Sequence, residues 1–327
     1  MPSVGRRVRA HGRRGGEDGG VRIGVALGGG GLTGTAFHAG VLCALVEEIG
    51  WDARDAEVIV GTSAGSTAAA LMRTGFPPGD YVRRVTGRPM SAEGEAILGA
   101  LPSLVDPLPA TRGRRSPAAP DLVRAVARRP WRYRPGVAAA ALLPAGTRPV
   151  DPGAARLRSL FRSWPTRSLW ICAVDLRDGR RVVFGRDASA SVGDAVAASC
   201  AVPGYFEPVL IDGRRFVDGG AYSLVSLDLL AGLGLDAVVV SAPLSTLDWV
   251  AADPGNALRI PARAQLEREA ARVRRSGTRV VVVQPDARMR RIMGTNTMVA
   301  AKRPPVALAA RDFAGAVLGE QAPWLGH

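Results

Sequence analysis

Residues 58–72 read VIVGTSAGSTAAALM, a short apolar run followed by small residues and then by an alanine-rich stretch. The apolar run predicts a buried strand, and the alanine-rich stretch predicts a helix. Between them, Gly61-Thr62-Ser63-Ala64-Gly65 matches the pattern G-x-S-x-G. A serine at such a strand-to-helix turn projects its hydroxyl from the sheet, and Gly61, Ala64 and Gly65 are small enough to permit the turn. Ser63 is therefore the candidate nucleophile.

A glycine-rich loop lies upstream of this turn. Residues 21–27 (VRIGVAL) predict another buried strand, glycines occupy 28–31, and apolar residues recur at helical spacing from 35 to 49. Strand, loop, helix and strand in this order are typical of a parallel α/β sheet. No side chains shield the amides of Gly29, Gly30 and Gly31, which makes them candidates for an oxyanion hole, with Gly34 as a supporting glycine.

The same loop also fits a dinucleotide-binding fold, because Gly29, Gly31 and Gly34 spell G-x-G-x-x-G. That fold requires an acidic residue at the end of the second strand, where it holds the ribose of the cofactor. The second strand ends instead in Gly61-Thr62-Ser63. The sequence therefore favours an enzyme without a cofactor.

The rest of the chain extends the alternation of strands and helices. Further strands are expected at 169–176, 181–184, 209–211, 215–217, 237–241 and 278–283, and further helices at 194–201, 263–275 and 306–318. Asp212-Gly213 lies between two of these strands and predicts a tight hairpin turn. The fold class predicted is α/β, with a mainly parallel β-sheet sandwiched by helices.

The domain organisation follows from changes in composition. Residues 1–20 are rich in arginine and glycine and are expected to form a disordered basic tail. Residues 21–320 are expected to form a single domain. Within it, the pattern of 76–165 is looser, with helical pieces at 121–128 and 136–143. We interpret this part as a helical insertion that covers one face of the sheet.

A nucleophilic serine needs a base, and the histidine content limits the choice. The chain has three histidines, at positions 11, 38 and 327. Only His38 lies inside the expected fold, upstream of the serine, where a packed helix histidine is the simpler interpretation. A carboxylate acting directly on the serine is therefore favoured. Asp218-Gly219-Gly220, directly after the hairpin, offers one, although Asp218 considered alone also fits an ordinary turn residue.

Composition limits the classes of function. The chain has 327 residues and a formal net charge of +14, and Lys302 is the single lysine among 43 basic residues. So complete an arginine bias reflects genome composition as much as function. Aromatic residues make up 5% of the chain and no recognition element is present, which argues against nucleic acid. The cysteines are not at metal-ligand spacing, predict no metal site, and fit reduced thiols in the cytoplasm (Cys43, Cys172, Cys200).

The longest apolar stretch, at 137–143, is too short to span a membrane, so a soluble or peripheral protein is expected. Arginines gather between positions 88 and 134, and Trp131 and Tyr133 alternate with arginines there. Aromatic rings and basic residues favour an anionic membrane surface. We weigh peripheral docking through Arg128, Arg129, Arg132 and Arg134 equally with a solvated arginine-rich cover.

The three motifs together, in this order, resemble those of the patatin-like phospholipase family. The stretch 198–209 (ASCAVPGYFEPV), which leads to Asp218-Gly219-Gly220, is similar to the block before the family's catalytic aspartate. The resemblance covers about residues 21–240. It implies an α/β fold with a serine–aspartate dyad and no catalytic histidine. By this resemblance Ser63 is the nucleophile, Asp218 the base, the amides of 29–31 the oxyanion hole, and the substrate a fatty acyl ester of a lipid.

Two positions depart from the family pattern. Thr33 stands where relatives usually have arginine or lysine, and the run 221–226 (AYSLVS) lacks the asparagine that relatives tend to have after the aspartate. Either change could alter the loops around the site. An alternative function is therefore a catalytically weak or inactive family member that binds a lipid or a protein partner.

Overall fold

The fold is built on one mostly parallel sheet. A computed structural model describes residues 21–99, 116–149, 157–248, 258–322 and 324. The sheet in this part of the chain has eight strands in the order β5-β6-β3-β2-β1-β7-β8, with β4 paired to β3. Strands β1, β2, β3, β7 and β8 are parallel, and β4, β5 and β6 run antiparallel to their partners. The predicted fold class is confirmed. The strands are β1 (Ile23–Leu27), β2 (Val58–Thr62), β3 (Ser168–Asp175), β4 (Arg181–Phe184), β5 (Val209–Ile211), β6 (Arg214–Asp218), β7 (Ala237–Ser241) and β8 (Arg279–Val283).

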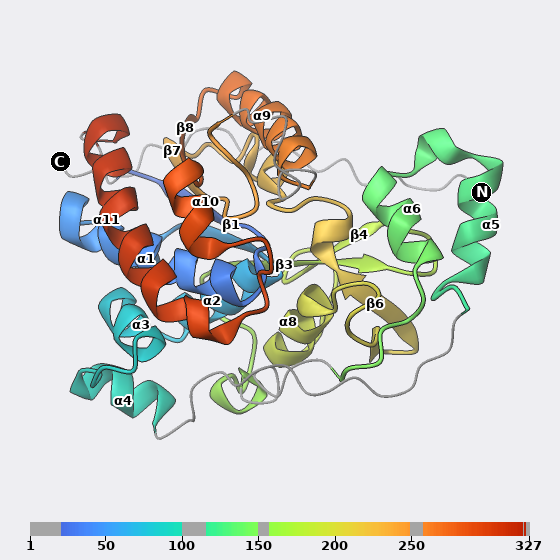
Figure 1. The fold of residues 1–327 in the computed structure, drawn as a ribbon, viewed down its shortest axis with the longest axis horizontal. Coiled ribbons are helices and arrows are strands. Elements are labelled where there is room, and N and C mark those ends of the chain that lie inside the picture. Colours follow the sequence, from blue (N-terminus) through green and yellow to red (C-terminus); the bar gives the residue numbers. More distant parts are fainter. Residues whose placement is uncertain (1–20, 100–115, 150–156, 249–257, 323, 325–327) are drawn as a thin grey trace, which may run out of the picture.

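Helices cover both faces of the sheet (Figure 1). Alternate residues of the central strands point to opposite faces, so Val25 packs with α1 and α11 while Ala26 packs with α9. The α-helices are α1 (Gly31–Ile49), α2 (Ala64–Arg73), α3 (Pro78–Val85), α4 (Ala92–Leu98), α5 (Pro120–Arg128), α6 (Pro135–Leu142), α8 (Val192–Cys200), α9 (Arg259–Arg275), α10 (Ala287–Met293) and α11 (Arg303–Gln321). The short 3-10 helices are η1 (Ala53–Asp55), η2 (Pro130–Arg132), η3 (Gly219–Ala221), η4 (Leu227–Leu230) and η6 (Ala300–Lys302).

Helix α1 lies at the centre of the fold. Among the described residues it alone is long and apolar enough to cross a membrane by length and composition. However, 83% of its apolar window is buried inside the fold. It packs against α2, α3 and α11, and its residues Phe37 and Leu42 are fully buried. Its apolar character is accounted for by core packing.

The helical segment at 76–165 is divided into two parts. Helices α3 and α4 lie near α1 at one end of the molecule, whereas α5 and α6 lie at the other end (Figure 1). Two predicted helical pieces are confirmed as α5 and α6. The expectation of one cover over one face was wrong, because α5 and α6 have a separate apolar core with Val174, Leu176 and Val217 at the ends of β3 and β6.

Local turn chemistry explains several boundaries. Asp212 and Gly213 both have positive φ, at 48° and 72°, as the predicted hairpin requires. Helices α9 and α11 begin three or four residues earlier than the apolar pattern predicts. Pro261, Pro304 and Pro305 lie in their first turns, where a missing N–H leaves no hydrogen bond unmade.

Candidate active site

Ser63 lies on the sharp turn between β2 and α2. Its backbone has φ 53° and ψ −123°, a conformation that a non-glycine residue rarely adopts, and the residue is 6% exposed. A side chain at Gly61 or Gly65 would overlap the backbone of Ser66 or Leu27, so both glycines are required for the close packing of the turn. The predicted strand–turn–helix context of Ser63 is therefore present.

A second serine fixes the backbone of this turn. The Ser199 hydroxyl, fully buried in α8, accepts a hydrogen bond from the Ser63 amide at 2.8 Å and donates one to the Cys172 carbonyl at 2.7 Å. The Ser63 amide is thus engaged by Ser199. Ser199 lies in the stretch 198–209 before Asp218, but no role was predicted for it. The sequence signal for Ser199 was a single hydroxyl among small apolar residues, because a buried hydroxyl needs a hydrogen-bond partner.

Asp218 ends β6, beside the serine turn. The residue is 5% exposed, its amide donates to the Ala201 carbonyl at 2.9 Å, and its Oδ1 accepts from the Gly220 amide at 2.7 Å. Burial raises the pKa of Asp218 to about 6, and hydrogen bonds from the Ser63 hydroxyl and the Gly220 amide oppose this rise. A side chain at Gly219 would overlap the Cys172 carbonyl, so this glycine lets the chain turn sharply after the aspartate.

The glycine-rich loop lies against the serine. A Cβ atom at Gly29 would stand 3.4 Å from the Ser63 Cβ, and one at Gly34 would stand 3.4 Å from the Ala64 Cβ. The Gly29 amide, however, donates to the Leu224 carbonyl at 2.8 Å and is already engaged. Gly30 is the N-cap of α1 and Gly31 is its first residue, and the first amides of a helix lack partners within it. The predicted oxyanion hole stays a prediction, with the amides of Gly30 and Gly31 as its remaining candidates.

His38 is fully buried behind this loop. Its Nε2 lies 2.7 Å from the Gly28 carbonyl, which accepts, so Nε2 carries the proton and Nδ1 accepts from the Ser241 hydroxyl at 2.8 Å. Burial lowers the pKa of His38 to about 4, while the hydrogen bond to Gly28 opposes this shift. Both ring nitrogens are engaged away from Ser63, and the neutral ring stabilises the loop.

Replacing His38 with glutamine is expected to leave kcat/KM for a short-chain ester within about tenfold of the parent, since loss of a general base typically lowers rates 10²–10⁴-fold. A glutamine amide can still donate to the Gly28 carbonyl. The measurement is ester hydrolysis by protein whose folding is checked by circular dichroism. A loss beyond about 10²-fold in folded protein would show that a catalytic histidine had been overlooked.

Thr33, at one of the two departures, is fully buried in the first turn of α1. Its amide donates to the Thr297 carbonyl at 3.0 Å, and its hydroxyl has no hydrogen-bond partner among the described residues. The segment before η6 lies over Gly31, where an added Cβ would stand 2.8 Å from the Thr297 Oγ1 and 2.9 Å from the Met298 Sδ. Thr33 therefore faces protein. The chain between α10 and α11 contacts the glycine-rich loop through Thr297 and Met298.

The second departure is integrated into the fold by a buried carboxylate. Glu269 of α9 accepts from the Ser223 hydroxyl at 2.7 Å and from the Leu227 amide at 2.9 Å, and the Ser223 Oγ accepts from the Ser226 amide at 2.9 Å. Burial raises the pKa of Glu269. Since this run also supplies the Leu224 carbonyl to Gly29, the serines support the glycine-rich loop. No sequence pattern indicated Glu269, which comes from a helix far along the chain.

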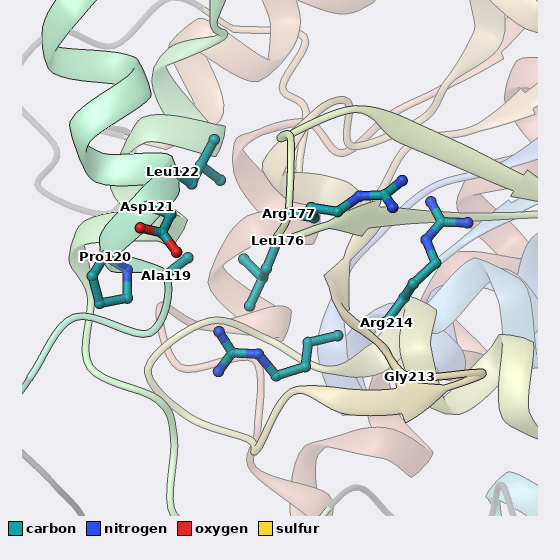
Figure 2. A pocket seen from close by; sticks show the side chains of 9 residues that line it. Ala119, Pro120, Asp121, Leu122, Leu176, Arg177, Gly213 and Arg214 are labelled. Carbon is teal, nitrogen blue, oxygen red and sulfur yellow. The ribbon is translucent and has the colours of Figure 1, made fainter.

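A cavity of about 300 Å³ opens at the beginning of α5, away from the serine (Figure 2). Two of its three arginines bind the surrounding chain: Arg214 binds the buried Asp175 at 2.9 Å, and Arg215 donates to the Ala118 carbonyl at 2.8 Å. No cluster of three metal-ligating side chains occurs in the part of the chain that the structure describes. The arrangement of Ser63 and Asp218 can support nucleophilic attack assisted by a carboxylate.

Comparison with known proteins identifies the family. Residues 25–231, more than half of the chain, match the family model of the patatin-like phospholipases. The crystal structure of VipD from Legionella pneumophila is 13% identical, with a TM-score of 0.44, over 92% of this chain and 67% of VipD. ExoU from Pseudomonas aeruginosa, in complex with SpcU, is 17% identical, with a TM-score of 0.36, over 92% of this chain and 52% of ExoU. This chain thus spans about half the length of ExoU. The match to the family model decides the assignment: the chain belongs to the patatin-like phospholipases, a family of lipid acyl hydrolases.

Proposed function

We propose that the protein is a serine acyl hydrolase that cleaves fatty acyl ester bonds of lipids through a Ser63–Asp218 dyad. The observation that carries the proposal is the Ser63 side chain beside a buried Asp218 with which it interacts and whose pKa is raised to about 6. A carboxylate of this basicity is ionised at neutral pH yet accepts a proton more readily than an ordinary aspartate.

The reaction proceeds in two steps. Asp218 takes the hydroxyl proton as Ser63 Oγ attacks the ester carbonyl carbon, and the resulting oxyanion accepts hydrogen bonds from the amides of Gly30 and Gly31. The C–O bond to the alcohol breaks, and the alcohol leaves with the proton held by Asp218. A water molecule then loses a proton to Asp218 and attacks the acyl carbon. Asp218 returns this proton to the Ser63 Oγ as the C–O bond of the acyl-enzyme breaks and the fatty acid leaves. The dipole of α2, which begins at Ala64, also favours the developing negative charge.

The match to a family whose members act on lipids supports a lipid substrate. Phospholipase A, lysophospholipase and esterase activities all fit this chemistry. Such an enzyme has to reach lipids at a surface, and we propose peripheral contact of a cytoplasmic protein with anionic membranes, without a nucleic-acid partner. The alternative is a weak or inactive family member that binds lipid. The observation behind this alternative is Thr33, which is fully buried at a position where the chain departs from the family pattern.

Labelling with a fluorophosphonate probe tests the proposal. The parent protein is expected to be labelled at one site, and Ser63→Ala is expected to lose labelling completely, because only an activated serine forms the phosphonyl adduct. Mass spectrometry of the labelled peptide identifies the residue. Assays with phospholipids, lysophospholipids and short-chain esters then define the substrate. An unlabelled, folded parent protein would favour the non-catalytic lipid-binding alternative.

A further inference from the structure

Helices α5 and α6 form an arm at one end of the molecule, on the side opposite α3 and α4 (Figure 1). The two helices pack together, and η2 joins them at the tip of the arm. Trp131 in η2 is 79% exposed, the largest exposed fraction among the large hydrophobic residues of the described chain. Arg128, Arg129 and Arg132, which surround it in sequence, are also exposed.

The arm is strongly basic. Residues 116–149 contain six arginines and a single acidic residue, Asp121, which pairs with Arg124 at 3.0 Å. Arg134 stacks 4.1 Å from the Tyr222 ring centroid and donates to the Tyr222 carbonyl at 3.2 Å. Arg148 stacks on another tyrosine. Arg128, Arg129 and Arg132 thus remain at the tip, with no ion pair or hydrogen bond to another described side chain.

The arm is packed directly against the chain around Asp218. Its apolar core includes Val217 and, at its border, Ala221 and Tyr222. At Gly136 the α6 backbone lies so close to the Ala221 carbonyl that a Cβ atom would overlap it. The arm therefore contacts the residues on both sides of Asp218. Packed side chains and backbone thus connect the tip of the arm, where a surface would bind, with the candidate active site.

We propose that the tip of this arm docks the enzyme on anionic lipid surfaces, with Trp131 at the headgroup level and Arg128, Arg129 and Arg132 facing the phosphates. The chemistry of the tip is complementary to such a surface, since tryptophan favours the membrane interface and arginine pairs bidentately with phosphate. Arg134, which the sequence analysis grouped with these arginines, instead stacks on the Tyr222 ring and donates to the Tyr222 carbonyl. The proposal rests on the proposed function, because it brings the lipid hydrolase to its substrate.

Flotation of the full-length protein with vesicles tests the docking surface. Phosphatidylcholine vesicles with and without phosphatidylserine are compared over a salt series, using the parent protein and a triple variant with Arg128→Gln, Arg129→Gln and Arg132→Gln. One basic residue near an anionic surface changes binding about fivefold, so the triple variant is expected to bind anionic vesicles roughly 100-fold more weakly and with less salt dependence. Trp131→Ala is expected to weaken binding to both kinds of vesicle.

A matched control variant, Arg275→Gln with Arg288→Gln and Arg291→Gln, removes the same charge from exposed sites on α9 and α10. It is expected to bind anionic vesicles nearly as the parent does, and both triple variants are expected to hydrolyse a soluble short-chain ester normally. Equal loss in both triple variants, salt-independent binding, or tighter binding to duplex RNA than to anionic vesicles would overturn the docking surface. Flotation does not require a reactive serine, so an inactive parent that floats would contradict the proposed function and leave the docking surface standing.

Discussion

Ser63→Ala and Asp218→Asn are each expected to lower kcat/KM for a short-chain ester by at least about 10³-fold, because each removes a group that acts on the reacting atoms. Ester hydrolysis is measured on protein whose folding is verified by circular dichroism. Asp212→Asn is the matched control: it makes the same substitution in the hairpin turn, where asparagine tolerates positive φ, and is expected to retain full activity. Full activity in folded Asp218→Asn would show that another group serves as the base.

The double variant Ser63→Ala/Asp218→Asn discriminates a dyad from two independent contributions. Groups that act as one unit lose function non-additively, so the double variant is expected to be little worse than either single variant. A product of the two single losses would mean that Asp218 contributes without assisting Ser63. The coupled case is consistent with the interaction between the Ser63 side chain and Asp218, which lowers the pKa of Asp218 against the larger effect of burial.

Much of the fold could be predicted because its signals are local. Strands β4, β5 and β7 begin and end where the apolar runs do, and Asp212-Gly213 forms the expected hairpin. The placement of the 76–165 helices could not be predicted in this way. The apolar faces of α5 and α6 indicate that they pack, but the residues they pack on, such as Val174 and Val217, follow in the sequence at a distance that no periodic pattern encodes.

In the candidate site, too, the features encoded locally could be predicted, and those that depend on distant segments could not. Ser63, its small neighbours and the glycine-rich loop carry their geometry within a few residues. Contacts between distant segments decide the rest: Ser199 holds the Ser63 amide, Leu224 takes the Gly29 amide, and Glu269 supports the run after Asp218. One such contact engages the Gly29 amide and leaves the amides of Gly30 and Gly31 as candidates for the predicted oxyanion hole. A glycine's sequence context does not reveal whether its amide already has an acceptor.

Two buried groups near the site give opposite contributions to the pH dependence of stability. The pKa of Asp218 rises from 3.8 to about 6, so between these values the folded state binds more protons than the unfolded state, and stability falls as pH rises. The pKa of His38 falls from 6.5 to about 4, so the unfolded state binds more protons, and stability rises with pH over that range. Between about pH 4 and pH 6 the two contributions offset each other in the parent protein.

Asp218→Asn is therefore expected to be more stable than the parent at pH 8, by on the order of 3 kcal/mol, because a pKa unit corresponds to about 1.4 kcal/mol and the buried negative charge is removed. The gain should vanish below about pH 4, where Asp218 is protonated in both states. The variant should also lose stability from about pH 6.5 to pH 4, since the His38 contribution is no longer offset. Urea unfolding across this pH range measures these differences, with Asp212→Asn again as control.

An equal change in stability at pH 4 and pH 8 would mean that the altered packing of the amide, and not the charge of Asp218, is responsible. The expected variant is inactive and is more stable than the parent only where Asp218 is ionised. This result would show that the charge of Asp218 lowers the stability of the fold, as expected of a base that reacts with Ser63.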